Sequence, residues 1–446
     1  MQPILSFEQA PPISVPYRFF LTAPLFGVIA GLLLAWYGAE AMSSRWSPAA
    51  LALTHLLAVD VMLQVMCGAL LQFVAVVAGA NIWRPHLVAS VVHPMITAGA
   101  VFLAAAFVLG LPILFLLAGA VFALGIGFFL TVMMLALWRT PARGMTVHVL
   151  RLAVFGLLVT LLLGITLAGI LGLQTSALPL LLLINVHVAW GLGGWALMLV
   201  IGVSYLVVPM FQLTPAYPEW LTRALPFGLL LVLCLWSLQL FSPADEAQAW
   251  QVQVAEAGML LAGLYAIVTL ILQYQRRRRQ TDVTLILWRV AMLSLLAFSA
   301  SWLLFEASPQ FGSHARAPLW LGVLVFPGAF LSVIIGMLYK IVPFLNWLHL
   351  QRLGEPATMP NMKQMMPEGA VRWQMRLHIS ALALLLMAVL WPAWALPAGL
   401  AFAASCLLLE WNLLGAVWLY CRVRDRAVKD RAVKDQIRAV GQDHET

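Results

Sequence analysis

The stretch "NVHVAWGLGGWALMLVIGVSYLVVP", residues 185–209, is apolar enough to cross a lipid bilayer, yet it carries an asparagine and a histidine near its start. A transmembrane helix needs about 20 mainly apolar residues. Asn185 and His187 would then lie inside the hydrocarbon, where an unpartnered polar group is costly, so they mark a candidate functional site. The rest of the chain indicates what these two side chains serve.

The composition is that of an integral membrane protein. Of 446 residues, 63% are hydrophobic and only 9% are charged, whereas soluble domains carry about 25% charged residues. The net charge of +8 comes from short basic loops and the tail, and it does not indicate nucleic-acid binding. The four cysteines are widely spaced and form no C-x-x-C pair, which argues against a disulfide framework or a zinc site.

Twelve apolar blocks, each long enough for a transmembrane helix, are separated by proline, glycine and charged residues. We predict an all-α polytopic membrane protein with one twelve-helix domain, residues 1–421, and a charged cytoplasmic tail, residues 422–446. The predicted spans are residues 18–39, 49–78, 88–110, 112–137, 147–172, 178–210, 222–241, 253–274, 284–305, 318–346, 376–393 and 397–421.

The distribution of basic residues predicts the orientation, because Lys and Arg mark the cytoplasmic side. Alternate loops hold Arg84, Arg139, Arg223 and the run Arg276–Arg279, whereas the loops between them are poor in basic residues. With twelve spans this pattern places both termini in the cytoplasm of a bacterium, and the protein in its inner membrane. The tail repeats "RAVKD", and we expect a solvated, weakly helical extension that meets anionic lipid headgroups.

Two series of residues recur at one interval. "GVSYLVVP" (202–209) resembles "GMLYKIVP" (336–343), and Gly68 stands 134 residues before Gly202. The first, fifth and ninth spans each begin with an arginine: Arg18, Arg151 and Arg289. Because a fixed period indicates a repeated unit, we predict three pseudo-equivalent units of four helices.

His55 in the second span and His187 in the sixth are predicted at matching depth, about 10 to 13 Å from the outer ends of equivalent helices. Neutral imidazole is a good ligand for iron or copper, and haem iron takes axial histidine. One interpretation is that the pair binds a cofactor, and that a flat macrocycle approaches over the small residues Ala189, Gly191, Gly193 and Gly194. The other is structural, because small residues also line close helix contacts in membranes and a histidine can hydrogen-bond a neighbouring helix.

The two histidines are out of phase within the repeat. His55 precedes Gly68 by 13 residues, and His187 precedes Gly202 by 15. Two residues turn a helix by about 200°, so the rings leave their helices in different directions. They either serve different pockets or bind one group from two sides.

Other polar residues also fall within or near the spans. Asp60 follows His55 by five residues, and we expect it to be either a proton carrier or a partner of His55 or an arginine. Asn185 is a further polar partner in the sixth span. His378 is predicted at the membrane interface.

Twelve helices in three groups of four, with a histidine near the outer end of the second span, resemble the catalytic subunit I of the haem-copper oxidases. The stretches "HLLAVDVMLQVMCGALLQFV" (55–74) and "HVAWGLGGWALMLVIGVSYLVVP" (187–209) are similar to that family, particularly its cbb-type and nitric oxide reductase branch. The opening "PYRFFLTAPLF" (16–26) is similar to the NnrS family. The resemblance implies that His55 is a haem ligand and that His187 is its partner or a separate ligand.

The copper site of that family is missing from this chain. The family uses a His-His pair on helix seven and His-x-His on helix ten, but the seventh and tenth spans here contain no histidine. In "NVH" on the sixth span, Asn185 stands where a first histidine would be. We therefore expect no enzyme that reduces oxygen or nitric oxide at a binuclear centre.

The resemblance implies an inner-membrane protein that binds haem b, with copper as the alternative metal. Its expected role is electron transfer or the handling of nitric oxide and respiratory stress, with a cytochrome or other respiratory subunits as partners. Two other functions stay open: a cofactor-free permease, and a structural subunit of a respiratory membrane complex. Transporters often contain inverted repeats with helices broken at the midplane, a pattern that three parallel units with few breaks do not match.

Overall fold

The structure of the chain is a computed structural model that describes residues 11–140, 142–175, 179–241, 244–277, 280–351 and 360–442. Arg278 and Arg279 of the basic run and the last four residues of the tail lie outside the described residues. Within the described ranges every regular element is a helix and none is a strand. The predicted all-α class is therefore confirmed.

Twelve helices of the described chain are long and apolar enough to cross a membrane, so the chain is a multi-pass membrane protein. The first unit contains α1 (Ser14–Tyr37), a second span made of α2 (Pro48–His55), η2 (Leu56–Leu63) and α3 (Gln64–Ala78), then α4 (Pro85–Leu109) and α5 (Pro112–Arg139). The second unit contains α6 (Met145–Leu173), a second span made of α7 (Leu180–Ala189), η3 (Trp190–Leu197) and α8 (Met198–Gln212), then α9 (Glu219–Ser237) with η4 (Leu238–Leu240), and α10 (Ala244–Tyr274).

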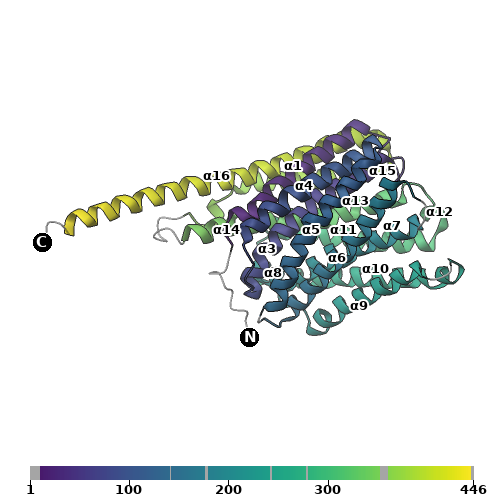
Figure 1. Cartoon of the computed structure of the whole chain (residues 1–446), viewed down its shortest axis with the longest axis horizontal. Helices are drawn as coiled ribbons and strands as arrows, with labels where there is room; N and C mark the ends of the chain where they lie inside the picture. Colours follow the sequence, from purple (N-terminus) through teal and green to yellow (C-terminus); the bar gives the residue numbers. More distant parts are fainter. Residues whose placement is uncertain are drawn as a thin grey trace.

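The third unit repeats this order with short additional helices. It contains α11 (Val283–Ala307), α12 (Pro309–Gly312), a second span made of α13 (Ala317–Val323), η5 (Leu324–Leu331) and α14 (Ser332–Gln351), then η7 (Met362–Gln364), α15 (Glu368–Leu390), η8 (Pro392–Trp394) and α16 (Ala395–Gln442). Figure 1 shows the helices packed side by side as one bundle.

Most predicted spans agree with these helices to within a few residues, and the largest differences are at α15 and α16. The helix α15 begins at Glu368, eight residues before the predicted span, because its first turns are polar and stabilised by the Glu368–Arg372 ion pair. The helix α16 does not stop after residue 421 but continues to Gln442 and extends beyond the bundle (Figure 1). Its tail contains good helix formers and has no Gly or Pro between residues 416 and 440.

The middle of the second span in each unit is a π-helical segment of eight residues: η2, η3 and η5. These segments begin at Leu56, Trp190 and Leu324, so consecutive segments are 134 residues apart. The glycine series predicted the same interval. Since π-helical turns are rare, their recurrence at this interval supports three equivalent units.

The packing of the repeated glycines is also equivalent in the three units. Each glycine faces the first helix of its own unit, within two residues of that helix's arginine: Gly68 faces Phe19 on α1, Gly202 faces Val149 on α6, and Gly336 faces Leu287 on α11. A Cβ at these positions would lie 2.8, 2.9 and 3.3 Å from those side chains. The glycines therefore allow the first two helices of each unit to approach closely.

The three second spans form the inside of the bundle. The apolar windows of these spans are 83%, 67% and 83% buried, whereas no other span exceeds 56%. Side chains on the second spans of different units therefore share the protein interior, even though they are more than a hundred residues apart in sequence.

One ion pair joins two helices of the third unit. The Asp282 carboxylate accepts from the Leu285 amide (2.9 Å) at the start of α11 and lies 3.0 Å from Lys340 Nζ on α14. Burial alone would raise the pKa of Asp282, but the Lys340 charge and these hydrogen bonds outweigh burial and lower the pKa below its usual value.

Candidate cofactor site

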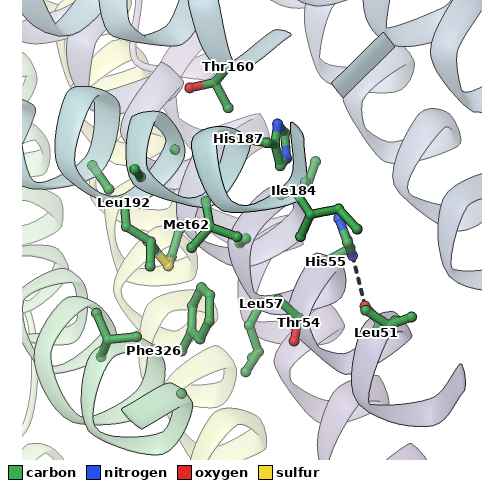
Figure 2. A pocket seen from close by; sticks show the side chains of 18 of the residues that line it. Leu51, Thr54, His55, Leu57, Met62, Thr160, Ile184, His187, Leu192 and Phe326 are labelled. Carbon is green, nitrogen blue, oxygen red and sulfur yellow. Dashed lines mark hydrogen bonds between the residues drawn. The ribbon is translucent and has the colours of Figure 1, made fainter. Parts of the chain in front are cut away.

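A cavity of about 950 Å³ lies between the N-terminal halves of the three second spans. Its wall includes side chains from all three π-helical segments, among them Met62, Leu192 and Phe326 (Figure 2). Cavities that bind small molecules and cofactors usually measure about 300–1,000 Å³. The wall is mostly apolar, and both histidines singled out in the sequence border it.

His55 is the last residue of α2, directly before the first π-helical segment. Its Nδ1 lies 2.8 Å from the Leu51 carbonyl oxygen, one turn earlier (Figure 2). A carbonyl oxygen only accepts, so Nδ1 carries the proton and Nε2 keeps its lone pair. The Phe107 ring of α4 stacks on the imidazole at a centroid distance of 5.1 Å. These two contacts orient the ring and leave its other nitrogen in the form that binds a metal.

The hydrogen bond from His55 is not specific to a metal site. His349 forms the same bond to the Leu345 carbonyl (2.9 Å), and His349 does not border the cavity. The bond is therefore an orienting contact, and position at the cavity is what distinguishes His55.

His187 lies on α7 and packs against α6. A Cβ at Gly164 would lie 3.1 Å from the imidazole Cε1 and 3.7 Å from Nδ1, so the ring fits beside this helix because residue 164 is glycine. Among the described residues, His187 Nδ1 is buried without a hydrogen-bond partner. An unsatisfied buried nitrogen costs about 1–3 kcal/mol, and a group bound in the cavity would remove that cost if it engaged this nitrogen.

The two histidines lie at matching depth and share one space. Each stands seven residues after the first residue of its span, Pro48 or Leu180, which is about 10 Å along the helix. The rings are close enough for a charge on one to act on the other, and Figure 2 shows both near Ile184. Of the two arrangements expected from the phase difference, the structure has the one in which both rings reach a single cavity.

The small residues after His187 divide between the two roles expected for them. Ala189, Gly191 and Gly193 border the cavity. Gly194 instead serves helix packing, because a Cβ at Gly156 of α6 would overlap its carbonyl oxygen. The cavity-lining interpretation and the packing interpretation therefore apply to different positions of the same segment.

Asp60 and Asn185 have different surroundings. Asp60 lies in η2, is fully buried and is not part of the cavity wall. Within the described part of the chain neither of its carboxylate oxygens has a hydrogen-bond partner, so it bonds neither to His55 nor to an arginine. Its role as a proton carrier stays a prediction. Asn185 borders the cavity, and its backbone carbonyl accepts a bond from Trp236 Nε1 (3.5 Å).

Two wall residues were not recognised in the sequence. Arg45 is the single charged side chain among the described residues of the wall, and its guanidinium lies 4.2 Å from the Trp46 ring centroid. Partial burial lowers the pKa of Arg45 from its ordinary value. Trp195 also borders the cavity, and its buried Nε1 has no acceptor among the described residues. The pair "RW" just before the N-cap Ser47 of α2 was the available sequence signal for Arg45.

The prediction that His378 is interfacial is wrong. His378 is 1% exposed, and its Nε2 lies 2.9 Å from Ser332 Oγ at the end of the third π-helical segment. Because α15 begins at Glu368, His378 is ten residues into the helix rather than near its end. It does not border the cavity.

Among the described residues, no group of three or more His, Cys, Asp or Glu side chains is placed to hold one metal ion. The cavity thus offers two imidazoles and one guanidinium to a ligand. No protein-family model matches the chain, and no curated protein is significantly similar to it.

Proposed function

We propose that the protein binds haem b in the central cavity, with His55 and His187 as the two axial ligands of the iron. The observation that carries the proposal is that histidines from two different units border one apolar cavity at the same depth. Two imidazoles match the two axial positions of a haem iron, whose other four ligands belong to the porphyrin.

The residues around the cavity fit this group. His55 Nε2 keeps a lone pair because Nδ1 donates to Leu51, and His187 Nδ1 lacks a protein partner among the described residues. Gly191 and Gly193 present no side chain where a flat ring would approach. Arg45 supplies a positive charge at the wall, which suits the two carboxylates that haem b carries at one edge.

Bound haem would supply one-electron redox chemistry. The protein would hold the ligand between α2 and α7, fix the His55 ring through Leu51 and Phe107, and exclude water with the apolar wall. We propose a role in electron transfer, or in the handling of nitric oxide and respiratory stress, within an oxidase-like fold without a copper site. A cytochrome or another respiratory subunit would be the electron partner, in a bacterial inner membrane with both termini in the cytoplasm.

The test is the visible spectrum of the purified protein before and after dithionite. We expect a Soret band that shifts on reduction, with sharp α and β bands typical of six-coordinate haem. His55→Ala and His187→Ala should each abolish this spectrum or convert it to a five-coordinate form. His349→Ala is the matched control, because that residue has the same backbone bond outside the cavity.

A folded wild-type protein that takes up no haem would contradict the proposal. So would full six-coordinate haem in the His55→Ala variant. A colourless protein with an intact fold would favour the cofactor-free permease, since the large apolar cavity would then need a different ligand.

A further inference from the structure

A second hollow, of about 500 Å³, lies at the other end of the first unit, where the loop between α3 and α4 meets the C-terminal end of α5. Its wall is formed by residues 79–84 of the loop, together with Ala136, Arg139 and Thr140. The hollow is separate from the haem cavity, because the two share no wall residue.

Two guanidinium groups, those of Arg84 and Arg139, belong to this one hollow. In the part of the chain that the structure describes, neither forms an ion pair with an acidic side chain. Other arginines near the same membrane face do have such partners: Arg223 pairs with Glu219, and Arg372 pairs with Glu368. Two like charges at one hollow repel each other, and an anion bound between them would offset that repulsion.

The loop that carries Arg84 is built into a defined shape. Gly79 ends α3 with φ +59°, and Arg84 has φ +41°, which is uncommon for a residue with a side chain. The Thr140 hydroxyl donates to the Ala78 carbonyl and so joins the end of α5 to the end of α3. Arg84 is also the N-cap of α4, whose first turn has no side-chain cap. The positive end of a 25-residue helix therefore adds to the two guanidiniums.

The hollow lies at the level of the membrane surface. Trp83 is 55% exposed and Trp138 is 80% exposed, and each directly precedes one of the two arginines. Tryptophan is enriched where the hydrocarbon meets the headgroups. The Arg84 guanidinium also lies 5.4 Å from the Trp83 ring centroid, so an aromatic contact helps to orient this cation.

We propose that this hollow binds the phosphate group of an anionic phospholipid, held between Arg84 and Arg139. The planar guanidinium matches phosphate oxygens with paired hydrogen bonds, and basic pockets between transmembrane helices at the cytoplasmic side suit such headgroups. The acyl chains would lie along the lipid-facing sides of α4 and α5. The site is independent of haem binding.

The experiment measures lipid binding to the purified full-length protein by native mass spectrometry, using phosphatidylglycerol and, separately, phosphatidylcholine. The double variant Arg84→Gln/Arg139→Gln is compared with Arg223→Gln/Arg372→Gln, which removes the same charge from two arginines outside the hollow. We expect phosphatidylglycerol to bind at least about tenfold more weakly to the first variant than to wild type. The control variant should bind as wild type does, and phosphatidylcholine should not distinguish the three proteins.

Equal phosphatidylglycerol binding by wild type and the Arg84/Arg139 variant, with both proteins folded, would overturn the proposal. A second arm adds inorganic phosphate at millimolar concentration. If inorganic phosphate displaces the lipid, the hollow is a site for free phosphate and the lipid assignment is wrong. If an acidic peptide binds there while phosphatidylglycerol does not, the hollow is a protein-docking site and the lipid assignment is also wrong.

Discussion

The contact between His187 and Gly164 permits a quantitative test of the proposed haem site. In Gly164→Ala the new methyl group would lie 3.1 Å from the imidazole Cε1. Carbon atoms prefer to be about 3.5 Å apart, so the ring or α6 must move by about 0.4 Å. Overpacking usually costs about 1–3 kcal/mol, and the lower end applies here because the ring borders a cavity and has room to yield.

The matched control for this substitution is Gly169→Ala on the same helix, where a Cβ would meet no atom within 4 Å. Both variants gain the same helix propensity, about 1 kcal/mol for Gly to Ala, so the difference between them reports the ring contact. We expect haem affinity, measured by Soret titration, to be about fivefold lower in Gly164→Ala than in Gly169→Ala, which corresponds to about 1 kcal/mol. The midpoint temperature of unfolding should also be lower in Gly164→Ala.

Two outcomes separate the local contact from the haem proposal. Equal unfolding temperatures and equal haem affinities in the two alanine variants would refute the placement of His187 against α6. A lower unfolding temperature in Gly164→Ala, in a protein that never binds haem, would support the placement and reject the proposed cofactor.

Three further predictions concern other parts of the molecule. Asp282→Asn should lower the free energy of unfolding by about 1 kcal/mol near neutral pH, because the carboxylate pairs with Lys340 at 3.0 Å and is only partly exposed. Since the pKa of Asp282 is lower in the folded protein, this contribution is present above the unfolded pKa of about 3.9 and is lost as the pH falls through the folded pKa. Thermal unfolding from pH 7 to pH 3 should therefore show the wild type and the variant converging, and a constant difference would count against the ion pair. Gly156→Ala should destabilise the protein by at least about 1–3 kcal/mol, measured by thermal unfolding, because its Cβ would overlap the Gly194 carbonyl oxygen; an unchanged unfolding temperature would be inconsistent with this close helix approach. If Arg45 meets the haem carboxylates, wild type should bind haem b more tightly than its dimethyl ester, and Arg45→Gln should bind the two about equally in Soret titrations; the same preference in both proteins would exclude that role.

Much of the architecture follows from local properties of the chain. Hydropathy over windows of about 20 residues identifies the spans because each helix must satisfy its own backbone within the bilayer. Regular spacing of Gly68, Gly202 and Gly336 predicted the repeat, and the three π-helical segments recur at the same interval. The depth of His55 and His187 also follows from counting along their helices.

Boundaries were less predictable where a helix leaves the apolar region. The first turns of α15 and the tail of α16 are polar, so hydropathy alone placed their ends inside the true helices. Helix formation there depends on propensity and on i,i+4 ion pairs such as Glu368–Arg372. The misplacement of His378 followed directly from the late predicted start of α15.

The sequence by itself determined that His55 and His187 are intramembrane histidines of equivalent spans and that they are out of phase. Only the tertiary structure decided that both rings border one cavity, that Gly194 packs against α6 while Gly191 borders the cavity, and that Asp60 stands apart from it. The physical reason is that hydropathy and periodicity describe a helix relative to the bilayer. The neighbours of a side chain are set by how helices distant in sequence approach one another, and this depends on close packing between their surfaces.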